Sequence, residues 1–209
     1  FLDAGPGFGG SCFKKDILNL VYLSKYFGLE EVANFWEGVV ELNNWHQNRI
    51  SNLIVKKLFG TVTGKKISIL GFAFKANTND TRESAAIQIC KDLLDEGAKI
   101  VIHDPKVNPK QIESDLNMPI NSNKIDTFNL NNIHNEGSWD FTINIKNALK
   151  DADAAVILTE WNEYSNIDWK AAYKIMRKPA WLFDSRSIID PNKVKSTGLN
   201  LWRIGDGTI

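Results

Sequence analysis

The sequence lacks the features that define several large protein classes. Its 209 residues include only two cysteines, Cys12 and Cys90, which lie far apart in unlike surroundings, so a disulfide framework is not expected. No uninterrupted apolar run approaches the ~20 residues that span a bilayer, and no basic, apolar signal peptide opens the chain. Internal repeats, low-complexity tracts and a metal-ligand pattern are also lacking. We therefore expect a soluble, reduced, cytoplasmic protein without a metal site.

An excess of charge of one sign is lacking as well. Basic and acidic residues number 25 each, so the formal net charge is zero. This balance argues against bulk electrostatic binding to nucleic acid or to an anionic membrane. It leaves room for a small positive pocket around a phosphorylated ligand. The length suffices for one large domain or two small ones with a substantial core.

Two helical patterns are present near the start of the chain. Apolar residues at helical spacing predict a helix over 14–28, with Gly28 as its stop. A longer pattern over 30–60 predicts a helix of about 28 residues, or roughly 40 Å. A helix this long, apolar and aromatic is typical of a bridge between domains or of a dimer interface. A buried core helix is the alternative.

From residue 63 onward, strand-like runs alternate with helical ones. The predicted strands are 66–74, 99–105, 154–161, 180–186 and 200–205, and the predicted helices lie near 83–96, 144–151, 167–177 and 190–197. Nearly continuous Ile, Val and Leu with helical crossovers is typical of a parallel sheet covered on both faces. The predicted fold class is therefore α/β, with a helical segment over 1–62 and a doubly wound parallel sheet over 63–209. The stretch 117–140, rich in Asn, Ser and Asp, is predicted to be an insertion or a long, mobile surface loop.

The opening stretch FLDAGPGFGGSCFKKD is the first place where chemistry could occur. Ser11 is predicted to be a helix N-cap, which leaves Cys12 in the first turn. The positive end of the helix and the adjacent Lys14 and Lys15 favour the nucleophilic thiolate. Asp16 lies one turn along the same face, where a carboxylate can position water or relay a proton. The alternative is a small buried cysteine in a tight turn.

A second candidate locus is ILGFAFKANTNDTRES, where a strand is predicted to end at Leu70 and Gly71 to make the turn. A helix is predicted to begin near 81–84. Ligands bind α/β sheets at the carboxyl ends of strands, and a helix N-terminus suits phosphate. Lys75 and Arg82 could supply cations there. A surface turn with ordinary solvated charges is the alternative.

Other polar residues near predicted strand ends have weaker signals. Arg186 in FDSR could reach the same cleft, and the alternative is a satisfied surface arginine. His103 in HDP is predicted to cap its strand or to pack locally. Cys90, inside an apolar helical pattern, is predicted to belong to the core.

In their order along the chain, FLDAGPGFGGSCFKKD, GFAFKANTNDTRES, HDPKV, ILTEW and FDSR resemble the UDP-glucose/GDP-mannose dehydrogenase family, and within it the UDP-glucose 6-dehydrogenases. That family has an N-terminal NAD-binding Rossmann domain, a long central helix that builds the dimer, and a C-terminal UDP-binding domain. The resemblance covers nearly all 209 residues. It implies a catalytic-cysteine loop with dimerisation helices over 1–62 and a Rossmann-like UDP-sugar-binding domain over 63–209. The implied partners are a UDP-sugar and a second copy of the protein.

The resemblance also implies a reaction. The family oxidises the C6 alcohol of UDP-glucose to the carboxylate of UDP-glucuronate in two steps that use two NAD⁺. It implies that Cys12 is the nucleophile, which forms a thiohemiacetal and then a thioester. It implies that Asp16 handles water and protons in those steps.

Binding roles follow from the same resemblance, position by position. The loop from Phe1 to Gly9 resembles the segment that wraps the nucleotide-sugar. The implied substrate-binding residues are Phe1, Leu2, Gly5, Phe8, Gly9, Phe74, Lys75 and Arg186. Arg82 is implied to reach the NAD cofactor. Ser185, where many relatives have glycine, and Lys14, where proline or glutamine is common, depart from the family pattern.

Part of the family's machinery lies upstream of the cysteine loop. It includes a catalytic lysine, an asparagine, a glutamate, the glycine-rich NAD loop and an arginine lent by the neighbouring subunit. We therefore expect the 209-residue chain to be an excised C-terminal portion that lacks turnover alone and binds UDP-sugar at most weakly. One alternative is a dehydrogenase of GDP-mannose, UDP-N-acetylglucosamine or UDP-N-acetylmannosamine. The other is a non-catalytic nucleotide-sugar-binding or dimerisation module.

Overall fold

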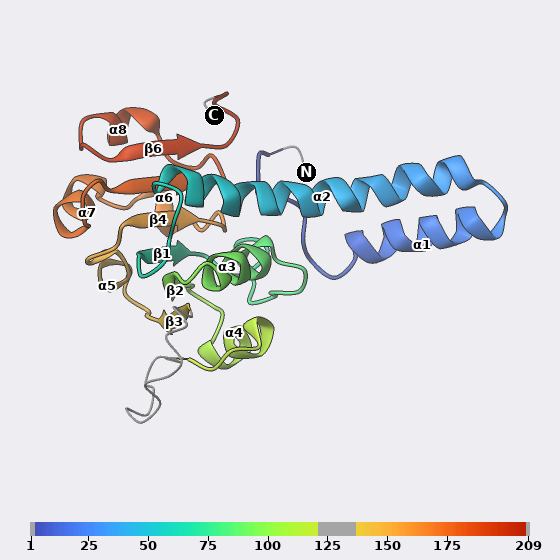
Figure 1. The fold of residues 1–209 in the computed structure, drawn as a ribbon, viewed down its shortest axis with the longest axis horizontal. Helices are drawn as coiled ribbons and strands as arrows, with labels where there is room; N and C mark the ends of the chain where they lie inside the picture. Colours follow the sequence, from blue (N-terminus) through green and yellow to red (C-terminus); the bar gives the residue numbers. More distant parts are fainter. Residues whose placement is uncertain (1–2, 121–136, 208–209) are drawn as a thin grey trace.

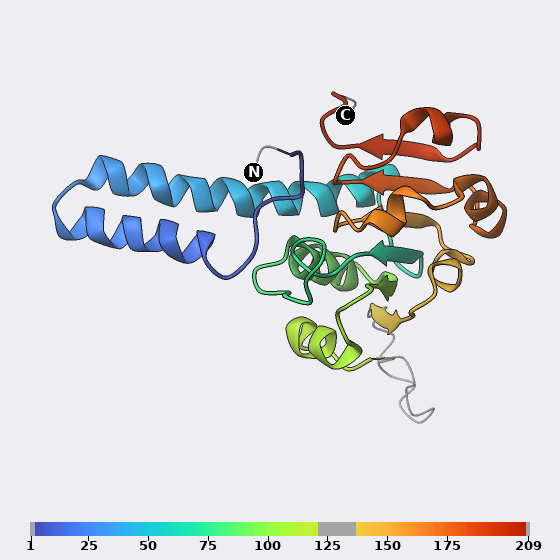
Figure 2. The ribbon, with the colours of Figure 1, turned by 180° about the vertical axis from the view of Figure 1, so that it is seen from behind.

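A helical hairpin and an α/β sheet form the molecule, which a computed structural model describes over residues 3–120 and 137–207 (Figure 1). Helices α1 (Phe13–Tyr26) and α2 (Glu30–Lys57) pack against each other and project from the sheet, as both views show (Figures 1 and 2). Gly28, with φ +72°, lies between them. The two helices and the predicted 28-residue length of the second are confirmed.

Six parallel strands form one sheet in the order β3-β2-β1-β4-β5-β6. The strands are β1 (Lys66–Leu70), β2 (Lys99–His103), β3 (Ser138–Phe141), β4 (Ala154–Ile157), β5 (Trp181–Asp184) and β6 (Asn200–Arg203). The remaining helices are α3 (Ala85–Asp95), α4 (Pro109–Leu116), α5 (Ile145–Leu149), α6 (Asn162–Ser165), α7 (Trp169–Ile175) and α8 (Pro191–Lys195). The predicted doubly wound α/β fold is confirmed. Because the strand order reverses between β1 and β4, ligands are expected outside their carboxyl ends.

Two hydrophobic cores cover the faces of the sheet, because successive strand residues point to opposite sides. Val156 of β4 packs into the core that also holds α3, whereas Ile157 packs into the core that holds α7. The C-terminal half of α2 belongs to the first core through Ile50 and Ile54, both of which are fully buried. The hairpin is therefore fixed to the sheet along about half of its longer helix.

The predicted elements are all present, but the strands end earlier than predicted. The predicted strand 66–74 ends at Leu70 because Gly71 adopts φ +95° and turns the chain. Helices α4 and α6 were not predicted. For α4 the missed signal is local, since the Asn108 side chain accepts a hydrogen bond from the Gln111 N–H and Pro109 occupies the first turn.

The predicted insertion over 117–140 is wrong at its C-terminal end. Residues 138–140 begin strand β3, which pairs in parallel with β2 at the edge of the sheet. A four-residue edge strand with one buried side chain, Trp139, has too short an apolar pattern to be recognised beside polar neighbours. Residues 121–136 of the predicted loop lie outside the described residues.

The projecting hairpin carries large apolar side chains on its surface. Tyr26 and Phe27 at its tip are 72% and 69% exposed, and Phe35 and Trp45 of α2 are exposed too. Apolar surface of this extent on one element is typical of an interface. Within residues 3–120 and 137–207, no helix combines the length and the apolarity required to cross a membrane.

Candidate active site

The glycine-rich loop before α1 is fastened to the middle of α2. The Phe8 N–H donates to Asn43 Oδ1 at 2.8 Å, and Asn43 Nδ2 donates to the Phe8 carbonyl at 3.2 Å. The His46 Nε2 atom lies within hydrogen-bond distance, 3.1 Å, of the Gly5 carbonyl. Because Asn43 is buried and uses both ends of its amide on one backbone unit, it fixes the loop at Phe8.

On its other side, the same loop is pressed against the connection between β1 and α3. The Gly10 N–H donates to the Arg82 carbonyl at 2.8 Å. A Cβ at Gly9 would lie 2.4 Å from the Glu83 carbonyl oxygen, so only glycine allows this approach. Gly10, with φ +87°, packs against the ring of Phe74. The glycine-rich loop and the β1–α3 connection, about 70 residues apart in sequence, thus form one surface.

Cys12 is exposed at the N-terminus of α1, which excludes the alternative of a buried structural cysteine. The predicted cap is wrong: Cys12, and not Ser11, occupies the N-cap position, and no side chain caps this helix. The Ser11 hydroxyl lies 3.5 Å from the Cys12 sulfur. The Asp16 N–H donates to the Cys12 carbonyl at 2.9 Å, so Asp16 lies one helical turn beyond the thiol, and it is also exposed.

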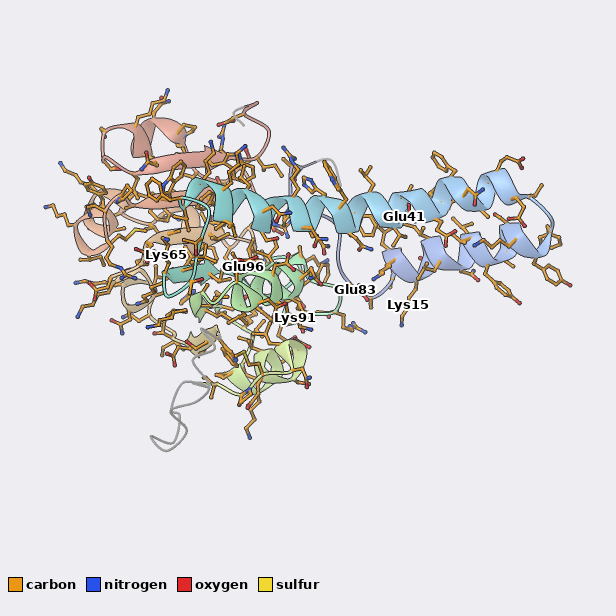
Figure 3. The ribbon with its side chains drawn as sticks, in the orientation of Figure 1. Lys15, Glu41, Lys65, Glu83, Lys91 and Glu96 are labelled. Atoms are coloured by element: carbon orange, nitrogen blue, oxygen red, sulfur yellow. The ribbon has the colours of Figure 1, made fainter. Side chains whose placement is uncertain are left out.

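Only one of the two lysines beside Cys12 is unpaired among the described residues. Lys14 Nζ forms an ion pair of 2.7 Å with Glu83 of the β1–α3 connection. Figure 3 shows Glu83 beside the beginning of α1, where Lys15 is labelled. A half-exposed pair of this kind contributes about 0–1 kcal/mol to stability. Its main consequence is that the charge of Lys14 is compensated, while Lys15 remains exposed to solvent.

Asp104, directly after β2, organises the start of the β1–α3 connection. Its Oδ2 accepts hydrogen bonds from the Phe72 and Ala73 N–H groups at 2.8 and 3.1 Å and from Trp161 Nε1 at 3.3 Å. Its Oδ1 accepts from the N–H groups of Lys106 and Val107, both at 2.9 Å. Asp104 is 2% exposed. A buried carboxylate with five donors thus ties the carboxyl ends of β1, β2 and β4 together.

Two hydroxyl groups also hold this connection. Ser84, the N-cap of α3, donates to the Phe72 carbonyl at 2.8 Å, and its oxygen accepts from the Ala86 N–H. Thr159 donates to the Ala73 carbonyl at 2.6 Å. The predicted turn at Gly71 and the helix start at Ser84 are therefore confirmed.

Phe74 and Lys75 stand at the tip of this connection. The Lys75 ammonium lies 5.3 Å from the centroid of the Phe74 ring, in a cation–π contact. Lys75 is exposed and forms no ion pair within the described part of the chain. It is therefore a cation at the strand ends that is available to an anionic ligand.

Arg82 is also exposed, but it has a partner. Its Nε and Nη2 atoms donate to the two carboxylate oxygens of Asp80, at 2.9 and 2.6 Å. These hydrogen bonds lower the pKa of Asp80 and raise the pKa of Arg82, to which a nearby Cys12 thiolate adds a smaller effect. The charge of Arg82 is therefore compensated by Asp80, unlike that of Lys75.

Arg186, at the end of β5, is mostly buried and holds the neighbouring strand ends. Its Nε donates to the Leu158 carbonyl at 2.7 Å, and its Nη2 donates to the Phe74 carbonyl at 3.0 Å. Burial lowers the pKa of Arg186, and the carboxylate of Glu160 opposes that shift. Its Nη1 atom lies 3.1 Å from the position of a Cβ at Gly5. The alternative of a surface arginine is wrong.

Two other residues behave as predicted from local pattern. His103 is buried and pairs with Tyr164, whose hydroxyl lies 2.9 Å from its Nδ1 atom and donates to its carbonyl at 3.0 Å. Burial lowers the pKa of His103, and the charge of Glu163 partly opposes this. Cys90 is fully buried in the first core, and burial raises the pKa of its thiol.

The structure thus brings most of the predicted site residues together at the carboxyl ends of the strands. Gly5 lies beside Arg186, Gly9 lies against Phe74, and Arg186 donates to the Phe74 carbonyl. Phe8 and Cys12 belong to the same loop, and Lys75 and Arg82 to the same connection. Phe1 and Leu2 lie outside the described residues.

The sequence interpretation missed Asn43, Asp104 and Glu160. Asp104 and Glu160 belong to the motifs HDPKV and ILTEW, where an acidic residue within three positions of a strand's carboxyl end was the available signal. In the ranges 3–120 and 137–207, no group of three or more His, Cys, Asp or Glu side chains could hold a metal ion.

Comparison with known proteins gives two family matches. Residues 68–191 match the UDP-glucose/GDP-mannose dehydrogenase family, UDP binding domain, and residues 1–45 match the central domain of that family. UDP-glucose 6-dehydrogenase 2 of Oryza sativa subsp. japonica is 44% identical over 214 residues, which cover 98% of this chain and 43% of the rice protein. UDP-glucose 6-dehydrogenase of Drosophila melanogaster is 44% identical over 206 residues, or 98% of this chain and 42% of the fly protein. The chain thus spans about two fifths of the length of these relatives.

Solved structures share the fold at lower identity. A UDP-glucose dehydrogenase from Pyrobaculum islandicum superposes with a TM-score of 0.68 at 24% identity, over 95% of this chain and 38% of that one. A UDP-D-ManNAc dehydrogenase from Pyrococcus horikoshii superposes with a TM-score of 0.67, also at 24% identity, over 98% of this chain and 40% of that one.

Proposed function

The chain belongs to the UDP-glucose/GDP-mannose dehydrogenase family, and on that premise we propose that it carries the nucleophile and the UDP-sugar site of an enzyme that oxidises UDP-glucose to UDP-glucuronate. One observation carries the proposal. The loop that ends in Cys12 is fastened to the β1–α3 connection, and its Gly5 lies beside Arg186, at the strand ends where α/β sheets bind ligands. A reactive thiol and an unpaired cation, Lys75, thus border the same surface.

In the proposed mechanism, Cys12 supplies the covalent chemistry. The C6 alcohol first loses a hydride and a proton to become an aldehyde. The Cys12 thiolate adds to the aldehyde carbon, and the resulting oxygen takes up a proton, which gives a thiohemiacetal. Loss of a second hydride and a proton gives the thioester. Water then attacks the thioester carbon, the C–S bond breaks, and the thiolate leaves with the carboxylate product.

Asp16 is proposed to hold the water and to accept its proton in the last step. Its backbone position one turn from Cys12, on an exposed surface, suits that role. When bound, NAD⁺ accepts the hydride in each oxidation. In this chain, the exposed guanidinium of Arg82, whose carbonyl accepts from the Gly10 N–H of the cysteine loop, fits a contact to the cofactor's phosphates.

The UDP-sugar is proposed to lie between the glycine-rich loop and the β1–α3 connection. The family role of the loop assigns it contacts from Phe1, Leu2, Gly5, Phe8 and Gly9, and the connection adds Phe74 and Lys75. The diphosphate carries two negative charges, and Lys75 is a nearby cation without an ion-pair partner in the described chain. Arg186 completes the site from β5.

A homodimer through α2 is part of the same proposal. The exposed side chains Leu42 and Trp45 line, with Phe8 and His46, an apolar hollow of about 380 Å³ on this helix. Such a surface suits a protein partner. We propose 1–62 and 63–209 as the two domains, and a cytoplasmic location, where an exposed unpaired thiol remains reduced.

A titration of the purified 209-residue chain tests the proposal. UDP-glucose and UDP should bind measurably by calorimetry, more tightly than GDP-mannose or the UDP-N-acetylhexosamines. NADH should not accumulate when NAD⁺ is added, because the catalytic residues that the family places upstream of the cysteine loop are not in this sequence. Binding of none of these nucleotides would overturn the UDP-sugar site, and tighter binding of GDP-mannose would favour the sister activity. Steady production of NADH would show that the upstream residues are dispensable.

Replacing Lys75 with alanine should weaken UDP-glucose binding about tenfold or more, because one charge-assisted contact to phosphate contributes roughly 1.5–3 kcal/mol. The matched control is Lys65→Ala, which removes the same charge just before the amino end of β1, away from the carboxyl ends of the strands (Figure 3). The dissociation constants come from the same calorimetric titration. Equal losses in the two variants would mean that net charge, and not a site at Lys75, attracts the ligand.

A further inference from the structure

Glu160 lies three residues beyond the end of β4, beside the switch point of the sheet, and neither the family motifs nor the proposed mechanism gives it a role. Its carboxylate contacts two elements that are far from it in sequence. Oε1 accepts a hydrogen bond from the Ala76 N–H at 3.1 Å, in the β1–α3 connection. Oε2 lies 3.2 Å from Arg186 Nε, at the end of β5.

The contact with Arg186 is an ion pair without a hydrogen bond. The single N–H of Arg186 Nε is donated to the Leu158 carbonyl at 2.7 Å, so it is not available to Glu160. Glu160 Oε2 is buried, and no donor among the described residues forms a hydrogen bond with it. An unpartnered buried oxygen is unfavourable by itself. It is tolerated here because it supplies the negative charge beside a guanidinium whose side chain is only 15% exposed.

Hydrogen bonds to the backbone restrict the orientation of the Arg186 guanidinium. An arginine has five N–H donors, and two of these are used on the backbone carbonyls of Leu158 and Phe74. The Nη1 donors lie next to Gly5, in the loop proposed to wrap the nucleotide-sugar. The direction of these remaining donors therefore depends on how firmly the guanidinium plane is held.

We propose that Glu160 is a positioning residue for UDP-sugar binding, which acts by fixing the Arg186 guanidinium and the β1–α3 connection relative to each other. This inference rests on the proposed function of the site. Glu160 does not need to touch the ligand. Its two oxygens hold one element each, so that Phe74, Lys75 and Arg186 keep one arrangement.

The chemistry of the contact identifies the informative variants. Glu160→Gln keeps an oxygen acceptor for the Ala76 N–H but removes the charge that faces Arg186. Glu160→Ala removes both contacts. Glu163→Gln is the matched control, because Glu163 is an exposed glutamate three residues further along and its side chain makes no hydrogen bond within the described chain.

The experiment has a binding arm and an exchange arm, both with the 209-residue chain. Calorimetric titration with UDP-glucose should give a dissociation constant about tenfold higher for Glu160→Gln and unchanged for Glu163→Gln. In an Arg186→Lys background, Glu160→Gln should cause less than a twofold further loss, because the two residues act as one unit. Amide hydrogen exchange of the native chain without ligand should be at least tenfold faster at Ala76 in Glu160→Ala, with β1 unchanged.

The two arms separate this inference from the proposed function. If the unaltered chain binds no UDP-glucose, the proposed function fails, and the exchange arm still decides whether Glu160 holds the connection. If the chain binds and Glu160→Gln binds equally well, the positioning role is overturned. The positioning role would also be overturned if the losses of UDP-glucose affinity caused by Glu160→Gln and Arg186→Lys were fully additive in the double variant. Unchanged amide exchange at Ala76 in a folded Glu160→Ala protein would overturn the positioning role as well. If Glu160→Ala does not fold, the binding measured for Glu160→Gln, which preserves the hydrogen bond to Ala76, decides the question.

Discussion

Iodoacetamide added to the native chain is expected to alkylate Cys12 and to leave Cys90 unmodified for as long as the fold persists. Cys12 is exposed at the N-terminus of α1, where reagent in solution reaches its sulfur directly. Cys90 is fully buried among apolar side chains, and burial raises the pKa of its thiol. Both access and ionisation therefore oppose reaction at Cys90.

The expected ratio of the two rates is at least about 10³. Reagent reaches Cys90 only when the core opens, and an opening free energy of 5 kcal/mol or more leaves fewer than about one molecule in 10³ open. Peptide mass spectrometry over a time course at neutral pH measures both rates. Saturating UDP-glucose should slow the reaction at Cys12, if the sugar lies over the thiol as proposed.

Two controls make this measurement decisive. In denaturant the two thiols should react at rates within a few-fold of each other, because burial no longer distinguishes them. Cys12→Ser should remove the fast phase and leave the slow one. Comparable rates at Cys12 and Cys90 in the native chain would contradict the burial of Cys90, and no modification of Cys12 would contradict its role as an accessible nucleophile.

The same contrast between these cysteines shows what a sequence can predict about this fold. Cys90 sits in an apolar pattern of helical period, and Cys12 follows a run of glycines, so local pattern alone assigned them to core and to loop. The strands β1, β2, β4, β5 and β6 were predictable for the same reason. The apolar runs of β1, β4 and β5, near the centre of the sheet, are buried on both faces, as is typical of a parallel sheet with helices on both sides.

Residues whose role comes from a distant partner could not be predicted in this way. Asn43 lies on a helix whose pattern predicts only amphipathicity, and its amide binds Phe8, 35 residues earlier in the chain. Glu160 contacts Ala76, 84 residues away. Nothing in the neighbourhood of either residue encodes the partner, because the fold alone brings the two segments together.

The N-cap of α1 shows a different limit. Ser11 is a residue type that favours the cap position, yet the helix begins one residue later with Cys12 as its N-cap. The reason is tertiary: the Gly10 N–H is already bonded to Arg82, and Gly9 is pressed against Glu83, so the loop direction is set before the helix starts. Local propensity is too small, at about 1 kcal/mol, to override those contacts.

Replacing Asp104 with asparagine should destabilise the protein by about 3–6 kcal/mol. Asp104 accepts five hydrogen bonds on two oxygens, and an amide has only one oxygen. Whichever way the amide turns, its NH₂ group faces at least two donors that lose their acceptor. Each buried N–H left unpaired costs roughly 1–3 kcal/mol, and the lost charge weakens the bonds that remain.

An effect of this size would approach the whole stability of many domains, about 5–15 kcal/mol, so the folding midpoint in urea should fall markedly. Urea titrations followed by circular dichroism should compare Asp104→Asn with Asp140→Asn, which neutralises an exposed carboxylate on the edge strand β3 and should change stability by less than 1 kcal/mol. Because Asp104 holds the Phe72 and Ala73 N–H groups, UDP-glucose binding should weaken even where the variant remains folded. Equal stability of the two variants would show that the carboxyl ends of β1 and β2 are held without Asp104, and the β1–α3 connection would then owe its shape to its other contacts, with Ser84, Thr159, Glu160 and Arg186.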